Sequence, residues 1–105
     1  MNECVSDEND VIADKLIGEY MTLYKHFTGY EHPNLKEEQL KHIKEELITY
    51  MGEYCLEPED ISKMIIYFFE NPPKGSDGNI NLFISKSVFV RTGYSAGTIS
   101  GYVDF

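Results

Sequence analysis

The sequence has no tryptophan, only two cysteines, and half as many basic as acidic residues: nine Lys and Arg against 18 Asp and Glu, a net charge of −9. Cys4 and Cys55 lie far apart without a CxxC pair, which argues against a disulfide framework or a zinc site. We expect Cys4 to be a solvent-facing thiol and Cys55 a small apolar filler at a helix end.

Long hydrophobic runs are also missing. No stretch approaches the roughly 18 apolar residues that a membrane span needs, and the acidic start MNECVSDEND lacks the basic and apolar parts of a signal peptide. These absences predict a cytoplasmic protein. With 105 residues, 42% of them hydrophobic, the chain is long enough to bury a core, so we expect a single domain over residues 1–105, with residues 1–7 flexible.

The charge is unevenly distributed. Residues 1–60 carry 15 acids and 5 lysines, a balance of 5 − 15 = −10, whereas residues 61–105 carry 4 basic and 3 acidic residues, 4 − 3 = +1. An acidic field of this kind repels nucleic acid and membrane surfaces and attracts basic proteins. It also keeps a protein soluble, and that alternative role needs no partner.

Two helices are predicted in the acidic half. Apolar residues at helical spacing predict the first over residues 8–28, with Gly29 ending it. The second is predicted over residues 35–54, where Asn34 and Glu37 have the spacing of a capping box. Its apolar face comprises Leu40, Ile43, Leu47, Met51 and Tyr54.

A third helix is predicted over residues 58–70, because Pro58 suits its first turn and Pro72 and Pro73 end it. Its segment MIIYFF is apolar on all sides, so we expect it to form the core element against which the first two helices pack. Residues 74–79, KGSDGN, then form an exposed loop.

The C-terminal segment ISKSVFVRTGYSAGTISGYV resembles the helix-turn-helix unit of bacterial and phage regulators. Gly93 falls at the turn, Tyr94 follows it, and Ile99 and Tyr102 take apolar places in the second helix. The resemblance implies a mostly α, truncated winged-helix fold that contacts DNA. The candidate contacts are Lys86, Arg91, Ser95 and Thr98.

A β-hairpin is the other interpretation of this segment, and the favoured one. Nine of the thirteen residues in 88–94 and 98–103 are β-branched or aromatic. Gly97 can take the left-handed conformation of a bulged turn, and the alternation in INLFI can add a strand. Residues 94–105 also lack Arg, Lys, Asn and Gln, which supply most base-edge contacts. The predicted class is therefore α+β: three helices packed on a small antiparallel sheet over residues 80–104.

No catalytic or metal-binding constellation emerges. His26, His32 and His42 have no spacing that defines a metal site or a nucleophile–base pair, and we expect ordinary surface or partly packed histidines. Adjacent carboxylates such as Glu45 and Glu46 point in different directions on a helix. We expect a protein that is not an enzyme and has no cofactor.

Size, acidity and the missing catalytic groups make the chain similar to phage-encoded inhibitors of host defence, including anti-CRISPR proteins and DNA mimics. The similarity implies a protein of the host cytoplasm that binds and blocks a basic nucleic-acid-handling protein. The candidate contacts are Glu37, Glu38, Glu45, Glu46, Glu53, Glu57, Glu59 and Asp60. Two alternatives remain: a DNA-binding regulator that uses residues 85–105, and a structural or assembly subunit.

Overall fold

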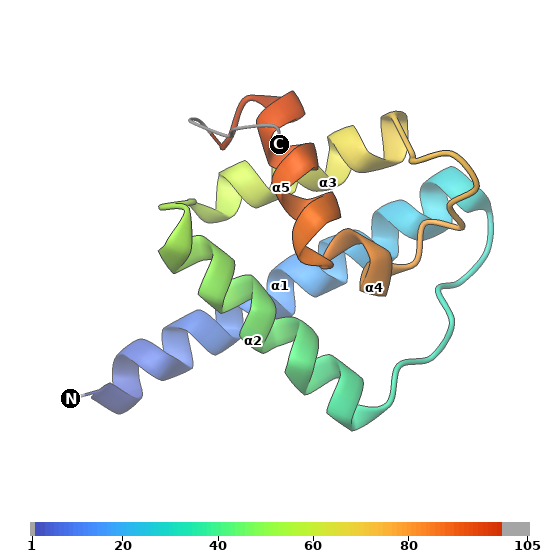
Figure 1. The fold of residues 1–105 in the computed structure, drawn as a ribbon. Coiled ribbons are helices and arrows are strands. Elements are labelled where there is room, and N and C mark those ends of the chain that lie inside the picture. Colours follow the sequence, from blue (N-terminus) through green and yellow to red (C-terminus); the bar gives the residue numbers. More distant parts are fainter. Residues whose placement is uncertain (1, 100–105) are drawn as a thin grey trace.

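The fold is known from a computed structural model, which describes the backbone of residues 2–99 and the side chains of residues 8–99. Five helices follow one another in this range (Figure 1): α1 (Asn2–Thr28), α2 (Glu37–Glu53), α3 (Pro58–Glu70), α4 (Ile80–Phe83) and α5 (Lys86–Ala96). Residues 2–99 contain no strand. The predicted α+β class is therefore wrong, and the described chain is all-α, in agreement with the mostly α alternative.

Helix α1 connects the other long helices, because it packs against both α2 and α3. It begins at Asn2, before the predicted start at residue 8, and ends at Thr28. Gly29 has a φ of +82°, which confirms that this glycine terminates the helix. The buried residues Leu16, Tyr20 and Tyr24 recur every four positions, so one face of α1 enters the core. Among the described helices, none is both long and apolar enough to cross a membrane.

The start of α2 differs from the prediction. Lys36, not Asn34, is the N-cap, and its backbone N–H donates to Gln39 Oε1 at 2.9 Å. The predicted start of α3 is confirmed, since Pro58 is its first residue. Here the backbone N–H of Glu57 donates to Asp60 Oδ2 at 2.9 Å, so an acidic side chain also sits where the helix dipole favours it.

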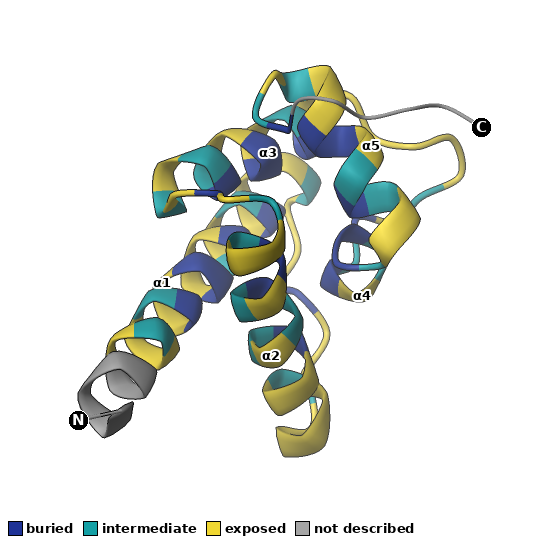
Figure 2. Cartoon of the chain, turned by 60° about the vertical axis from the view of Figure 1, so that its left-hand side comes forward, coloured by how far each residue is buried: buried dark blue, intermediate teal, exposed yellow. Residues whose placement is uncertain are grey.

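Helix α3 lies in the middle of the fold, with α1 on one side and α5 on the other. Its buried residues are Ile61, Met64, Ile65, Phe68 and Phe69. It is not enclosed on all sides, because Ile66 is 43% exposed and Lys63 is also exposed. In addition, α2 packs chiefly against α1 rather than α3. Figure 2 shows the buried residues facing inward on all the long helices.

Helical packing explains why the segment INLFI is not a strand. Ile80, Phe83 and Ile84 are the buried residues, at positions i, i+3 and i+4 of a helix. Asn79 begins α4, since its Oδ1 accepts from the backbone N–H of Asn81 at 2.9 Å. An alternation over five residues fits a strand or a short helix equally well, and here contacts with the core select the helix.

Helix α5 occupies most of the predicted hairpin. Val88, Val90 and Thr92 favour strands intrinsically, but burial of Phe89 and Gly93 on one helical face overrides that preference. Gly93, the expected turn of a helix-turn-helix, lies inside α5. Gly97 does adopt the predicted left-handed conformation, with a φ of +83°, but it ends α5 instead of turning a hairpin. The second predicted strand extends beyond residue 99, outside the described residues.

Buried polar side chains from the N-terminal part of the chain hold residues 78–84 in place. The Tyr20 hydroxyl donates to Gly78 O, and the Tyr50 hydroxyl donates to Ile84 O at 2.9 Å. The backbone N–H of Ile80 donates to His32 Nε2 at 3.0 Å, so the His32 proton lies on Nδ1, which donates to Pro33 O at 2.8 Å. His32 is therefore more buried than predicted, and serves as a structural anchor.

The Cys55 side chain is exposed, so the prediction of an apolar filler is wrong. Its φ of +55° places it in the left-handed turn between α2 and α3, and Leu56, which is 5% exposed, enters the core instead. Cys4 lies outside the residues whose side chains are described.

Candidate functional site

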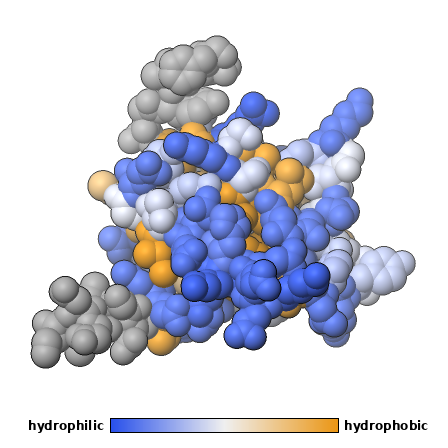
Figure 3. Space-filling model, turned by 60° about the horizontal axis from the view of Figure 1, so that its bottom comes forward, coloured by the Kyte–Doolittle hydropathy of each residue, from blue (hydrophilic) through white to orange (hydrophobic). Residues whose placement is uncertain are grey.

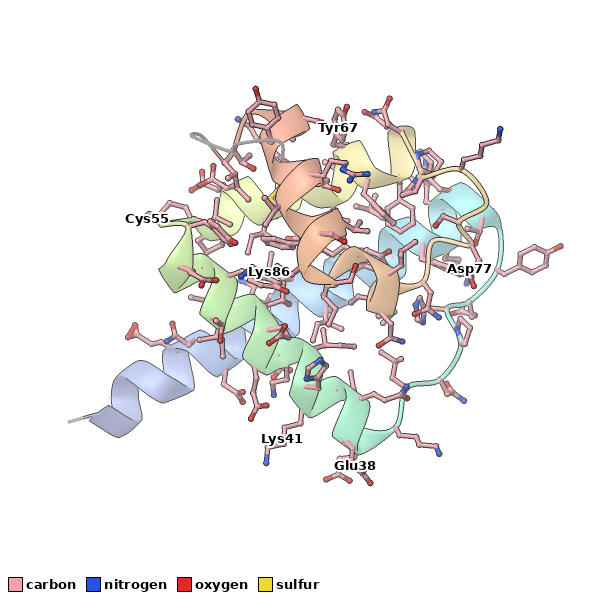
Figure 4. All side chains as sticks on the ribbon, viewed as in Figure 1. Glu38, Lys41, Cys55, Tyr67, Asp77 and Lys86 are labelled. Carbon is pink, nitrogen blue, oxygen red and sulfur yellow. The ribbon has the colours of Figure 1, made fainter. Side chains whose placement is uncertain are left out.

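Helix α2 separates its side chains into two sets. Ile43, Leu47 and Tyr50 face the core, whereas Glu38, Glu45 and Glu53 are exposed. The exposed residues lie seven and eight positions apart, so at 3.6 residues per turn they share one side of the helix. Figure 4 shows Glu38 and Lys41 near the beginning of α2, pointing away from the other helices.

Six of the eight predicted partner contacts are exposed and follow one another along α2 and the beginning of α3. We call this set the acidic strip: Glu37, Glu38, Glu45, Glu53, Glu57 and Glu59. None of the six forms an ion pair with a cation among the described residues. Figure 3 shows the corresponding face of the molecule, on which hydrophilic side chains predominate. Their carboxylates therefore remain available to an external cation.

The other two predicted contacts are half-buried and have internal roles. Asp60 caps α3, as described above. Glu46 Oε1 lies 3.1 Å from the Tyr50 hydroxyl oxygen, so it shares the single phenol proton with Ile84 O. Burial, followed by the negative charge of Glu46 and this hydrogen bond, raises the pKa of Tyr50 to about 12. Charge reversal at Glu46 or Asp60 would therefore disturb the fold as well as the surface.

A groove of about 680 Å³ separates the beginning of α2 from α1. Its carboxylates come from Asp10, Glu37, Glu38 and Glu45. Lys44 bridges the two helices, because its Nζ lies 2.9 Å from Asp10 Oδ1 and 3.2 Å from Asp14 Oδ1. The hydrogen bond to Asp10, and then the one to Asp14, raises the pKa of Lys44.

Asp10 therefore extends the carboxylate surface of α2 onto a second helix. Neither Asp10 nor Asp14 is among the predicted partner contacts. Their position beside α2 depends on the crossing of α1 and α2, and no local pattern in the sequence signals that crossing.

The alternative DNA-binding residues do not act as one group. Arg91 and Ser95 lie one turn apart on α5 and border the same groove against α3. Lys86 lies at the opposite end of α5, and Figure 4 shows it directed toward α2. Thr98 follows the helix, and its hydroxyl donates to Gly93 O at 3.2 Å, which helps to close the end of α5.

Within residues 8–99 no group of three or more His, Cys, Asp or Glu side chains is arranged to hold a metal ion. The acidic strip thus consists of separate carboxylates along a surface, which suits contacts with several cationic side chains rather than one ion.

Comparison of the chain with protein-family models, with curated proteins and with solved structures finds no match. Support for a function therefore comes from the geometry and charge of the chain itself.

Proposed function

We propose that this protein binds a basic surface of a nucleic-acid-handling protein and blocks it, as anti-CRISPR proteins and DNA mimics do. The observation that carries the proposal is the acidic strip: six exposed carboxylates in succession, without ion pairs to described cations. Lys41 lies three or four positions from Glu37, Glu38 and Glu45, the spacing of helical ion pairs, but it forms no ion pair with them. Here the main ion pairing of α2, that of Lys44, is directed to α1.

The spacing of the strip suits a protein surface that normally follows a phosphate backbone. At about 1.5 Å per residue, Glu38, Glu45 and Glu53 are separated by roughly 10 and 12 Å along α2. Phosphates along one DNA strand rise by about 3.4 Å each along the duplex axis, so each of these distances corresponds to about three phosphate steps along that axis. The net charge of −9 would also steer a basic partner toward the protein at low salt.

The first experiment separates this proposal from direct DNA binding. Labelled duplex DNA is titrated with the protein at about 50 mM salt, where phosphate contacts are weakly screened, and fluorescence anisotropy is recorded. We expect no saturable binding, because the acidic half repels phosphates. Saturable binding that weakens in Lys86→Ala and Arg91→Ala variants would contradict the proposal and favour the DNA-binding alternative.

The second experiment tests inhibition and the surface that causes it. Cleavage of a labelled duplex by a panel of purified guide-RNA-loaded CRISPR nucleases and restriction endonucleases is measured with increasing amounts of the protein. We expect inhibition of a panel member, relieved by excess DNA because protein and DNA compete for one basic groove. Glu38→Lys, Glu45→Lys and Glu53→Lys combined should abolish it.

A matched variant controls for net charge. Glu19→Lys, Glu31→Lys and Glu70→Lys combined change exposed acids outside the acidic strip. They also remove two surface contacts, Ser62 Oγ–Glu19 Oε1 at 2.7 Å and Lys25 Nζ–Glu31 Oε2 at 2.6 Å. Both triple variants have a net charge of −9 + 6 = −3, and circular dichroism verifies that both retain their helices. Equal loss of inhibition in the two variants would attribute the effect to overall charge, and no inhibition of any panel member would contradict the proposal.

A further inference from the structure

A second groove lies between α3 and α5, on elements that do not contribute to the groove beside α1. It encloses about 230 Å³. The half-buried Val88 and Tyr67 provide its accessible apolar and aromatic surface, above the buried Phe68. The polar border comes from Asn71, Arg91 and Ser95. In Figure 4, Tyr67 lies where the end of α3 meets α5.

Arg91 is the single arginine of the sequence. It is exposed, and within residues 8–99 its guanidinium has no carboxylate partner. The chain nevertheless contains 18 acidic and nine basic residues, so acids are in excess. Ser95 lies one turn further along the same side of α5. Asn71 Nδ2 uses one N–H to donate to Tyr67 O at 3.2 Å, which leaves its second N–H for a ligand.

The size of the groove limits what it can bind. Sites for drug-sized ligands occupy about 300–1,000 Å³, so a groove of about 230 Å³ suits a single side chain. A guanidinium offers a planar fork that matches a carboxylate with two parallel hydrogen bonds. The apolar surface of Val88 and Tyr67 suits the methylene groups that precede a carboxylate.

The number of cations in the groove favours a single protein carboxylate over the many phosphates of a nucleic acid. Nucleic acids are bound through many phosphate contacts at once, whereas the described residues that line this groove include one cation. We propose that the groove between α3 and α5 binds one aspartate or glutamate side chain of a partner protein, through Arg91 with Ser95 and Asn71. This site is independent of the acidic strip and does not require the inhibitory function.

The test uses the full chain and a probe of defined chemistry. The ¹⁵N-labelled protein is titrated with N-acetylglutamate methylamide, whose single charge is a side-chain carboxylate, and with the neutral N-acetylglutamine methylamide. We expect the carboxylate probe to shift the Arg91 Nε–H resonance and the backbone amides of Asn71 and Ser95 saturably, in the millimolar range. The neutral probe should leave them unchanged. Absence of saturable shifts with the carboxylate probe would overturn the proposal.

Variants of the groove make the test specific. Arg91 is exposed, so Arg91→Gln should keep the helical signal while weakening carboxylate binding by about tenfold. Arg91→Lys keeps the charge but loses the planar pair of N–H donors, so its affinity for the carboxylate probe should lie between those of the unchanged protein and Arg91→Gln. Lys63→Gln removes an exposed cation of α3 outside the groove and should change nothing. Undiminished binding in Arg91→Gln would overturn the proposal.

Two further titrations test whether the groove prefers a protein carboxylate or a phosphate. Inorganic phosphate and a short DNA duplex are titrated under the same conditions. If either shifts the groove resonances at lower concentration than the carboxylate probe, the groove recognises phosphate and the assignment to a protein carboxylate is wrong. Weaker or absent shifts with both, together with saturation by the carboxylate probe, support the assignment.

Discussion

At Gly93, helix α5 approaches its neighbours so closely that a larger residue has no room. A Cβ atom placed there would overlap Ile99 Cδ1, lie 2.6 Å from Ile99 Cγ1 and lie 3.0 Å from Met64 Cε. Alanine usually stabilises a helix by about 1 kcal/mol over glycine, but overpacking a core costs about 1–3 kcal/mol. We therefore expect Gly93→Ala to lower the free energy of unfolding by about 1 kcal/mol in urea denaturation.

Gly18 provides the matched control for this prediction. It is an exposed glycine inside α1, and nothing lies within 4 Å of a Cβ built on it. Gly18→Ala should therefore raise the free energy of unfolding by about 1 kcal/mol. If Gly93→Ala stabilised the protein as much as Gly18→Ala, this result would contradict the close packing of α5 against Ile99.

Ionisation of Tyr50 should make the free energy of unfolding depend on pH in the alkaline range. The folded protein holds the phenol proton to a pKa of about 12, whereas an ordinary tyrosine releases it near 10.0. Because the folded-state pKa is the higher one, the stabilisation is complete below about pH 10 and is lost as pH rises toward 12. Burial raises the pKa of Tyr20 as well, so its contribution changes in the same direction.

Tyr50→Phe isolates this contribution. At neutral pH the variant should be less stable by about 1 kcal/mol, because Ile84 O loses its hydroxyl donor. Urea denaturation between about pH 9 and 12 should show the difference between the two proteins shrinking as Tyr50 ionises. A difference that stays constant over this range would show that Tyr50 does not ionise there.

At the scale of the element, the start of α2 gives a direct comparison between sequence pattern and structure. Gln39 accepts from the Lys36 backbone, whereas Asn34 makes no side-chain hydrogen bond with the described residues. Gln39→Ala should therefore lower the free energy of unfolding by about 0.5 kcal/mol, and Asn34→Ala should have no effect. The reverse order in thermal or urea denaturation would favour the predicted start at Asn34.

The elements that sequence predicted well are those with strong periodicity and local stop signals. The first three helices were found because their apolar positions recur over several turns, and Gly29 and Pro58 mark boundaries that the backbone itself imposes. The hairpin prediction failed because the segment around α5 is rich in β-branched residues, while the contacts of Phe89 and Gly93 with distant helices select a helix. The β-propensity of a segment depends on its own residues, whereas the choice of a helix here depends on contacts with residues distant in the sequence.

For the whole molecule, the excess of negative charge should make stability depend on salt. A net charge of −9 causes self-repulsion that dissolved ions screen, since the Debye length falls from about 30 Å at 0.01 M to about 8 Å at 0.15 M. We expect the free energy of unfolding in urea to rise over this range. The rise should be smaller in both triple variants of net charge −3, and a fall with salt would show that exposed ion pairs outweigh the repulsion.

The candidate sites were predictable only in part. The exposed carboxylates of α2 follow from helical periodicity, so the strip could be proposed from the sequence. The inclusion of Asp10 depends on the crossing of α1 and α2. Similarly, Arg91 and Ser95 were expected at a DNA surface, but their groove exists only because α3 supplies Tyr67 and Phe68 opposite them. Sequence patterns identify side chains on one element, whereas a groove needs two.

The three buried anchors have a consequence for the order of folding. Tyr20, His32 and Tyr50 bind backbone groups of residues 78–84 across separations of 58, 48 and 34 residues. Contacts that close such long loops form after the local helices, because the chain loses conformational entropy on closing the loop before the contact can stabilise it. During synthesis, residues 78–84 also leave the ribosome last of these groups. Until residues 78–84 arrive, the Tyr20 hydroxyl, His32 Nε2 and the Tyr50 hydroxyl therefore lack these backbone partners, and the core stays incomplete.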